Sequence, residues 1–217
     1  MIKAVLFDMD GVLVDARDWH FEALNRALGL FGMQIDRDAH LATFDGLPTR
    51  KKLEILSKTR GLPVKLHGIL SDLKQKATVE LAYANCRPSF QHCYALARLK
   101  REGYKLAVCS NSIRHTVELM MSLAQLDQYL DFTLSNEDVK RAKPAPDIYE
   151  QAITRLGLKP HEVVIVEDNE NGLEAGRRSG GHVLMVGGVE DVTYTRLRED
   201  IDRLDGDGAA RHPGDRT

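Results

Sequence analysis

The chain has 217 residues, enough for one large domain or for a main domain with a smaller domain inserted into it. Hydrophobic residues make up 43% of it and charged residues 29%, a balance that excludes a wholly disordered protein. Lys and Arg number 30 against 32 Asp and Glu, so no overall positive charge favours a nucleic-acid partner, and no apolar run reaches the roughly 18 residues of a membrane span.

Five short apolar segments are predicted to be strands. They lie at residues 3–7, 105–109, 131–134, 162–166 and 183–186. Most of them are apolar throughout, which is typical of strands buried on both faces of a parallel sheet. Between them, apolar residues recur three and four positions apart over 113–124 and 148–156, which predicts helices. The alternation predicts an α/β fold with a Rossmann-like parallel sheet.

Residues 15–87 interrupt this alternation. They contain no convincing strand, and their three or four helical patterns are separated by breaks such as Asp45-Gly-Leu-Pro48. We expect an all-helical cap domain over 15–87, inserted directly after the first strand, and an α/β core domain made of 1–14 and 88–204. Residues 205–217 lack periodicity and are expected to form a loose, disordered tail.

The three cysteines, Cys86, Cys93 and Cys109, are too few for a disulfide framework, and none forms a CxxC pair of the kind that binds zinc. The first residues hold a short apolar run that ends in acidic residues rather than in the cleavage site of a secretory signal. We therefore expect a cytoplasmic protein with reduced thiols.

Polar residues follow the predicted strands at the points where the strands end. In chain order they are Asp8, Asp10, Ser110, Asn111, Lys143, Glu167 and Asp168. Ligands of an open parallel sheet bind beyond the carboxyl ends of its strands. We therefore expect these side chains to converge on one site.

A cluster of carboxylates beside apolar strand ends predicts a bound cation, because like charges repel unless a cation neutralises them. Oxygen donors without a nearby histidine or thiolate favour Mg²⁺. Together with a lysine and a hydroxyl, the cation would form a receptacle for a phosphoryl group. Asp8 and Asp10 are two residues apart, so both can reach one phosphate: one can attack phosphorus and the other can transfer protons. Gly11 permits the tight turn that this requires.

These motifs resemble those of the haloacid dehalogenase (HAD) superfamily. The matching residues are Asp8-Met-Asp10-Gly11, Ser110, Lys143-Pro-Ala-Pro-Asp147 and Glu167-Asp168-Asn-Glu-Asn-Gly172, which occur in the order of the family and span most of the chain. The sequence is most similar to the branch of β-phosphoglucomutase-like phosphatases, whose helical cap is inserted just after the first motif.

The resemblance implies a role for each core residue. Asp8 would be the nucleophile and a magnesium ligand, and Asp10 the general acid and base, with its main-chain carbonyl on the metal. Ser110 and the main-chain amide of Asn111 would bind the phosphoryl group, and Lys143 would neutralise it. Asp168 would complete the metal site, together with Glu167 directly or through water.

The cap is expected to select the substrate. His20 lies where mutase-like members of the branch place a histidine near the hinge, and Gly46 lies in a segment similar to the branch's substrate loop. Arg50 could hold a distal phosphate or carboxylate, although a solvated arginine explains it as well. Of the lysines in the last cap helix, Lys76 is the one expected to face the cleft.

The resemblance implies a Mg²⁺-dependent phosphatase that acts on a small phosphorylated metabolite, such as a sugar or polyol phosphate, as a monomer or weak homodimer. The main alternative is a sugar phosphate mutase. Mutases of the branch carry a Ser-Lys-Asn-like stretch after the second motif, whereas this chain has Ser112-Ile113-Arg114. A haloacid dehalogenase would leave Asp10 without a task, and a binding module without turnover would leave the filled catalytic positions unexplained.

Overall fold

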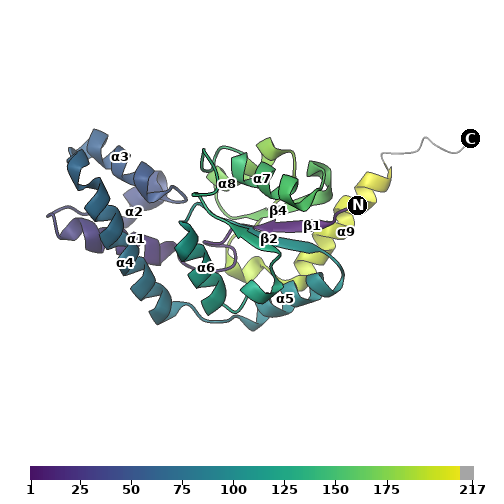
Figure 1. Cartoon of the computed structure of the whole chain (residues 1–217). Helices are drawn as coiled ribbons and strands as arrows, with labels where there is room; N and C mark the ends of the chain where they lie inside the picture. The colour runs from purple at the N-terminus through teal and green to yellow at the C-terminus, as the bar shows by residue number, and fades with distance from the viewer. Residues whose placement is uncertain (211–217) are drawn as a thin grey trace, which may run out of the picture.

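The computed structural model describes residues 1–210, and the side chains of residues 1–206. Its centre is a five-stranded parallel sheet in the order β3-β2-β1-β4-β5 (Figure 1). The strands are β1 (Ala4–Phe7), β2 (Lys105–Cys109), β3 (Phe132–Leu134), β4 (Val163–Glu167) and β5 (His182–Met185). The expected α/β class with a parallel sheet is therefore confirmed.

The register of the sheet aligns the ends of its three central strands. Phe7 of β1 pairs with Val108 of β2 on one side and with Val166 of β4 on the other. The residue after Phe7, Asp8, is therefore level with the last residues of β2 and β4, and the polar residues that follow these strands emerge at one edge.

Helices cover both faces of the sheet (Figure 1). One face is covered by α5 (Phe90–Arg101), α6 (Arg114–Leu123) and α9 (Tyr194–Ala210), and the other by α7 (Asp147–Leu156) and α8 (Glu170–Ser179). Successive strand residues point to opposite faces, so alternate residues of β1 pack into the two separate apolar clusters. This explains why the strands are apolar throughout.

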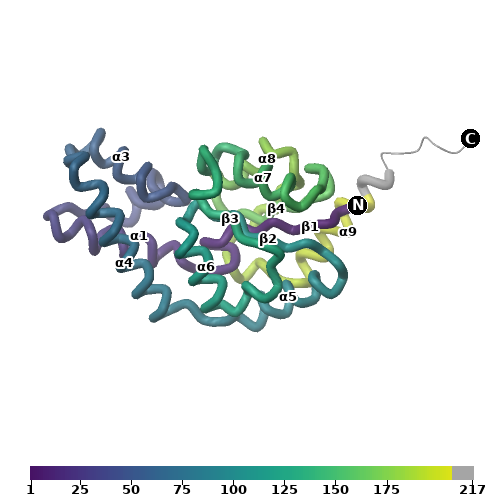
Figure 2. The backbone as a smooth tube through the Cα atoms, in the orientation of Figure 1, coloured from purple at the N-terminus to yellow at the C-terminus, as the bar shows by residue number. Residues whose placement is uncertain are grey.

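Residues beyond the carboxyl ends of the strands form a helical cap with its own apolar core (Figure 1). It contains α1 (Arg17–Gly29), α2 (Arg37–Ala39), a π-helical turn (His40–Phe44), α3 (Thr49–Arg60), a 3₁₀ turn (Val64–Leu66) and α4 (His67–Asn85). The chain enters the cap after β1 and returns to the core between α4 and α5, as the tube in Figure 2 shows. None of the helices in the described part of the chain is long and apolar enough to cross a membrane.

The last helix extends further than the sequence predicts. Residues 205–210 belong to α9, although they fall in the segment expected to be a loose tail. Leu197, Ile201 and Leu204 pack this helix against the core, and Asp205 accepts a hydrogen bond from the main-chain N–H of Ile2 at 2.6 Å. These contacts outweigh the low helix propensity of the glycines beyond them. Residues 211–217 of the expected tail lie outside the described residues.

Candidate active site

The aligned strand ends face the cap across a cleft of about 980 Å³. Nine of the predicted site residues line it: Asp8, Asp10, His20, Gly46, Arg50, Ser110, Asn111, Lys143 and Asp168. Glu167 lies behind this lining and is fully buried. The structure thus brings the residues of the four motifs together. The loop of residues 45–48, called the cap loop below, and helix α1 face them from the cap.

A buried lysine lies at the centre of the site. The ammonium group of Lys143 donates hydrogen bonds to Asp8 Oδ1 at 2.9 Å, to Glu167 Oε1 at 2.6 Å and to the main-chain oxygen of Cys109 at 2.7 Å. Burial alone would lower the pKa of Lys143, but the charges of Asp8 and Glu167 raise it above its ordinary value. The lysine therefore stays charged and fixes the nucleophile candidate beside the β4 end.

Asp8 is surrounded by negative charge. Its carboxylate, that of Glu167 and that of Asp168 each present an oxygen, and these atoms all lie within 4.8 Å of one another. Burial, and next the charge of Glu167, raise the pKa of Asp8 well above its ordinary value, despite the opposing effect of Lys143. Three carboxylates with oxygen donors only and a single buried ammonium fit a divalent cation such as Mg²⁺.

The position of Glu167 depends on two residues for which the sequence predicted no role. Tyr149 of α7 donates its hydroxyl hydrogen bond to Glu167 Oε1. On the other side, a Cβ atom at Gly172 would lie 1.9 Å from the Glu167 carboxyl group, so only glycine fits at this point of α8. Gly172 ended the fourth motif, but its role emerges only when the first turn of α8 is placed over β4.

Asp10 points away from the carboxylate cluster and toward the cap. His20 Nε2 lies 3.0 Å from Asp10 Oδ1, and Ser112 donates its hydroxyl to Asp10 Oδ2 at 3.1 Å. Burial on its own raises the pKa of Asp10, but His20, Ser112 and Lys74 together lower it below its ordinary value. Burial also lowers the pKa of His20, and a neutral imidazole can donate to Asp10 and accept at Nδ1 from Lys74, 3.1 Å away.

Ser110 and Asn111 directly follow the end of β2. Ser110 is buried, and its hydroxyl accepts a hydrogen bond from the main chain of Ser112 at 3.0 Å. The Asn111 side chain accepts from the Lys143 main-chain N–H at 3.0 Å and donates to the carbonyl of Gly46 at 2.9 Å. Asn111 therefore ties the cap loop to the core through its side chain, in addition to the main-chain role that the resemblance implies.

Gly46 is needed for this contact. Its φ of +68° lies in the left-handed region that favours glycine, and a Cβ atom there would lie 2.9 Å from Asn169 Oδ1. The cap loop can therefore approach the end of β4 only with glycine at this position.

Two cap expectations change with the structure. Arg50 lies at the mouth of the cleft, where its side chain is 87% exposed and pairs with Glu54. Lys76 is exposed and does not line the cleft, so the expectation that it faces the cleft is wrong. Two residues along a helix turn the side chain by about 200°, and it is Lys74 that points inward.

Arg17, for which the sequence predicts no role, joins the cap to the core. It donates to Asp168 Oδ2 at 2.6 Å and lies 3.3 Å from Asp45 Oδ2 of the cap loop. Its partners lie 151 and 28 positions further along the chain, so no local pattern indicates the contact.

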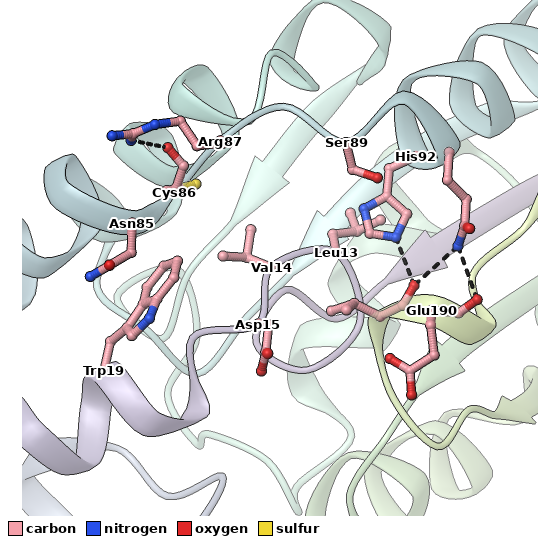
Figure 3. A pocket seen from close by; sticks show the side chains of 12 residues that line it. Leu13, Val14, Asp15, Trp19, Asn85, Cys86, Arg87, Ser89, His92 and Glu190 are labelled. Atoms are coloured by element: carbon pink, nitrogen blue, oxygen red, sulfur yellow. Dashed lines mark hydrogen bonds between the residues drawn. The ribbon is translucent and has the colours of Figure 1, made fainter.

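A second cavity of about 380 Å³ lies at the hinge, where the segments that join core and cap meet (Figure 3). Leu13, Val14, Trp19 and Cys86 give it a largely apolar wall, and His92 donates to the main-chain oxygen of Val189 at 2.8 Å. None of the predicted site residues lines it. The predicted chemistry therefore belongs to the larger cleft.

Known proteins resemble this chain in both sequence and structure. The sequence pattern of the haloacid dehalogenase-like hydrolases matches residues 5–186. A protein of Thermotoga maritima named phosphorylated carbohydrates phosphatase is 31% identical over 182 residues, 82% of each chain. A phosphoglycolate phosphatase of Aquifex aeolicus is 26% identical over 212 residues, 94% of this chain and 97% of the relative.

Solved structures agree with these matches. CbbY from Rhodobacter sphaeroides in complex with phosphate has a TM-score of 0.79 and 25% identity over 87% of each chain. β-Phosphoglucomutase from Clostridium difficile has a TM-score of 0.81 and 18% identity over 94% of this chain and 98% of that one, a likeness of fold. The expected superfamily and the phosphatase class are confirmed. The fold agrees with the expected β-phosphoglucomutase-like branch. The chain belongs to the haloacid dehalogenase-like hydrolase family.

Proposed function

We propose that this protein is a Mg²⁺-dependent phosphatase that hydrolyses a small phosphorylated metabolite, a sugar or polyol phosphate, through an aspartyl phosphate. The arrangement around Asp8 carries the proposal. Its buried carboxylate accepts a hydrogen bond from Lys143 at 2.9 Å and lies within 4.8 Å of carboxylate oxygens of Glu167 and Asp168. A carboxylate that lies beside a lysine and further carboxylates suits a nucleophile that works next to a cation.

The proposed reaction has two displacements at phosphorus. An oxygen of Asp8 bonds to phosphorus as the bond to the leaving alcohol breaks, and Asp10, which this step requires in its protonated form, gives its proton to the alcohol oxygen. In the second step Asp10 takes a proton from a water molecule, whose oxygen bonds to phosphorus as the bond to Asp8 breaks. Inorganic phosphate leaves and Asp8 is regenerated. Lys143 offsets the charge of the phosphoryl oxygens, and Ser110 and the main-chain N–H of Asn111 hold them.

The metal-binding side chains would be Asp8, Glu167 and Asp168, together with the main-chain oxygen of Asp10. Bound Mg²⁺ would supply positive charge that reduces the repulsion between the nucleophile and the phosphoryl group. The remaining groups lie on both sides of the metal site. Lys143 and Ser110 act from the core, and His20 contacts Asp10 from the cap.

Two observations support a sugar or polyol phosphate as the substrate. The cap side of the cleft offers hydrogen-bonding side chains of Thr49, Ser71 and Gln75, which suit the hydroxyl groups of such a compound. In addition, the relative from Thermotoga maritima is named a phosphorylated carbohydrates phosphatase.

Hydrolysis is favoured over the mutase reaction by the segment after β2. Ile113 lines the cleft with an apolar side chain, and Arg114 is held outside by Asp138 at 2.6 Å. Neither residue supplies the lysine that mutases of the branch carry there. Water is therefore the acceptor that we propose for the aspartyl phosphate.

The proposal is tested by measuring phosphate release from sugar, polyol and nucleotide monophosphates, with Mg²⁺ and with excess EDTA. Wild type and Asp8→Asn are assayed together, and melting curves check that both are folded. We expect release that requires Mg²⁺ and vanishes in Asp8→Asn, because an amide cannot attack phosphorus. Substantial release by a folded Asp8→Asn protein would refute the nucleophile assignment, and conversion of a sugar phosphate only when its bisphosphate is added would favour the mutase.

A further inference from the structure

Two lysines of the cap are buried without a carboxylate partner. Lys52 of α3 is 5% exposed and Lys74 of α4 is 8% exposed, and both line the cleft. Neither forms an ion pair within 4.0 Å in the described part of the chain, where Lys74 has only the ring nitrogen of His20 at 3.1 Å and Lys52 has no hydrogen-bond partner for its ammonium group.

The other buried charged side chains of the described residues are all paired. Lys143 pairs with Asp8 and Glu167, and Asp200 pairs with Arg203. This difference matters because a buried charge is costly unless an opposite charge and hydrogen bonds compensate it. The cap lysines therefore lack the compensation that the rest of the protein provides.

The pKa values of Lys52 and Lys74 are lowered, as expected for buried lysines without a carboxylate partner. Burial lowers the pKa of Lys52 to about 8. Burial, and next the charge of Lys52, lower the pKa of Lys74 to about 7. The charges of Asp45 and Asp10 raise the pKa of Lys52, but neither carboxylate lies within ion-pair distance of its ammonium group. An anion bound between the two ammonium groups would relieve their repulsion and supply the missing hydrogen-bond acceptors.

We propose that Lys52 and Lys74 form a subsite for a second anionic group of the substrate, a carboxylate or a phosphate, at the cap side of the cleft. The inference rests on the proposed function, in which the first phosphate reacts at Asp8 on the core side. The lysines lie on α3 and α4, whereas Asp8 and Ser110 follow β1 and β2, so the two anionic groups would sit at opposite walls of one cleft. The substrate class is then a phosphate monoester that carries a further negative charge.

The test compares compounds that differ by one anionic group. Glycerol 3-phosphate and 3-phosphoglycerate differ by a carboxylate, and glucose 1-phosphate and glucose 1,6-bisphosphate differ by a phosphate. Dissociation constants are measured by calorimetry in an Asp8→Asn background, so that binding is read without turnover. Lys52→Met and Lys74→Met are each added to this background, with Lys52→Gln as a second variant should Lys52→Met fold poorly. Lys58→Met is the matched control, since Lys58 is an exposed lysine of the same helix and lies outside the cleft.

We expect at least one doubly anionic compound to bind more tightly than its partner, and the pair that shows this identifies the group as carboxylate or phosphate. Lys52→Met should reduce that preference about tenfold to a hundredfold, the value of a desolvated hydrogen bond to a charged group, while Lys58→Met keeps it. Equal binding within both pairs, or a preference that survives both cap substitutions, would overturn the proposal. Because binding is measured without turnover, these dissociation constants test the subsite even if the phosphatase assay detects no phosphate release.

Discussion

The buried histidine of the cap should make the protein sensitive to acid. His40 lies in the π-helical turn and is 1% exposed, and neither ring nitrogen has a hydrogen-bond partner among the described residues. The Phe21 ring packs against it at 5.0 Å, and the nearest carboxylate oxygen, of Asp45, is 4.0 Å away. Burial, and then the charge of Lys52, lower the pKa of His40 from 6.5 to about 4.

The size of the effect follows from proton linkage. Above pH 6.5 the histidine is neutral in both the folded and the unfolded chain, so its titration does not affect stability. As the pH falls from 6.5 toward 4, the unfolded chain binds a proton that the folded chain does not, and the free energy of unfolding decreases. At about 1.4 kcal/mol for each pH unit, the loss is about 3 kcal/mol when it is complete and about 2 kcal/mol by pH 5.

Substitution of this histidine separates the effect from the titration of other groups. His40→Leu keeps a side chain of similar size and removes both unpaired nitrogens, so we expect it to be at least as stable as wild type at pH 7.5. Urea unfolding, followed by the fluorescence of Trp19, gives the free energy of unfolding at pH 7.5 and pH 5.0. Trp19 is the single tryptophan and lies on the first cap helix.

The stability difference between His40→Leu and wild type should grow by about 2 kcal/mol between these pH values. His115→Leu, at an exposed position of α6, is the control and should follow wild type. If the difference for His40→Leu stays constant from pH 7.5 to 5.0, His40 is protonated in the folded protein at the lower pH and the reasoning is refuted.

Three further predictions concern the core site. Gly172→Ala should cost about 1 to 3 kcal/mol in urea unfolding, because a methyl group would overlap the Glu167 carboxyl group, and a fully stable variant would show that Glu167 can move aside. Asp10→Asn should slow phosphate release about a hundredfold or more in rapid-quench kinetics, and unaltered rates would exclude its acid–base role. Arg17→Gln should tighten Mg²⁺ binding measured by calorimetry several-fold, because the guanidinium competes for Asp168; weaker binding would mean that Arg17 positions that carboxylate instead.

The core of the site could be predicted from the sequence for a simple geometric reason. Asp8, Ser110 and Glu167 each follow or end an apolar run, and a parallel sheet brings the carboxyl ends of its strands to one edge whatever the distance along the chain. The contacts around these residues could not be predicted in the same way. Tyr149 reads as part of an apolar helix face, and only the packing of α7 on the sheet places its hydroxyl on Glu167.

The site residues of the cap are harder to predict, because no rule comparable to the alignment of parallel strand ends applies to helices. The periodic apolar residues predicted its helices, but which lysine faces the cleft depends on the rotation of each helix about its axis. Lys74 is four residues after Leu70 and three before Ala77, so it lies on the buried stripe of α4, whereas Lys76 lies off it. Lys52 is likewise four residues before Leu56, on the buried stripe of α3.

A lysine that interrupts the apolar stripe of a helix is therefore itself an indication of function. An apolar residue at such a position would stabilise the cap more than a lysine does. A lysine elsewhere on the helix, facing solvent, would contribute equally to solubility. A lysine on the buried stripe therefore needs another explanation. Two such lysines occur on neighbouring helices, and both face the cleft across from Asp8. Stability does not explain two buried lysines that lack a carboxylate partner, whereas recognition of an anionic group does, because the cost of burying their ammonium groups is offset when the substrate binds.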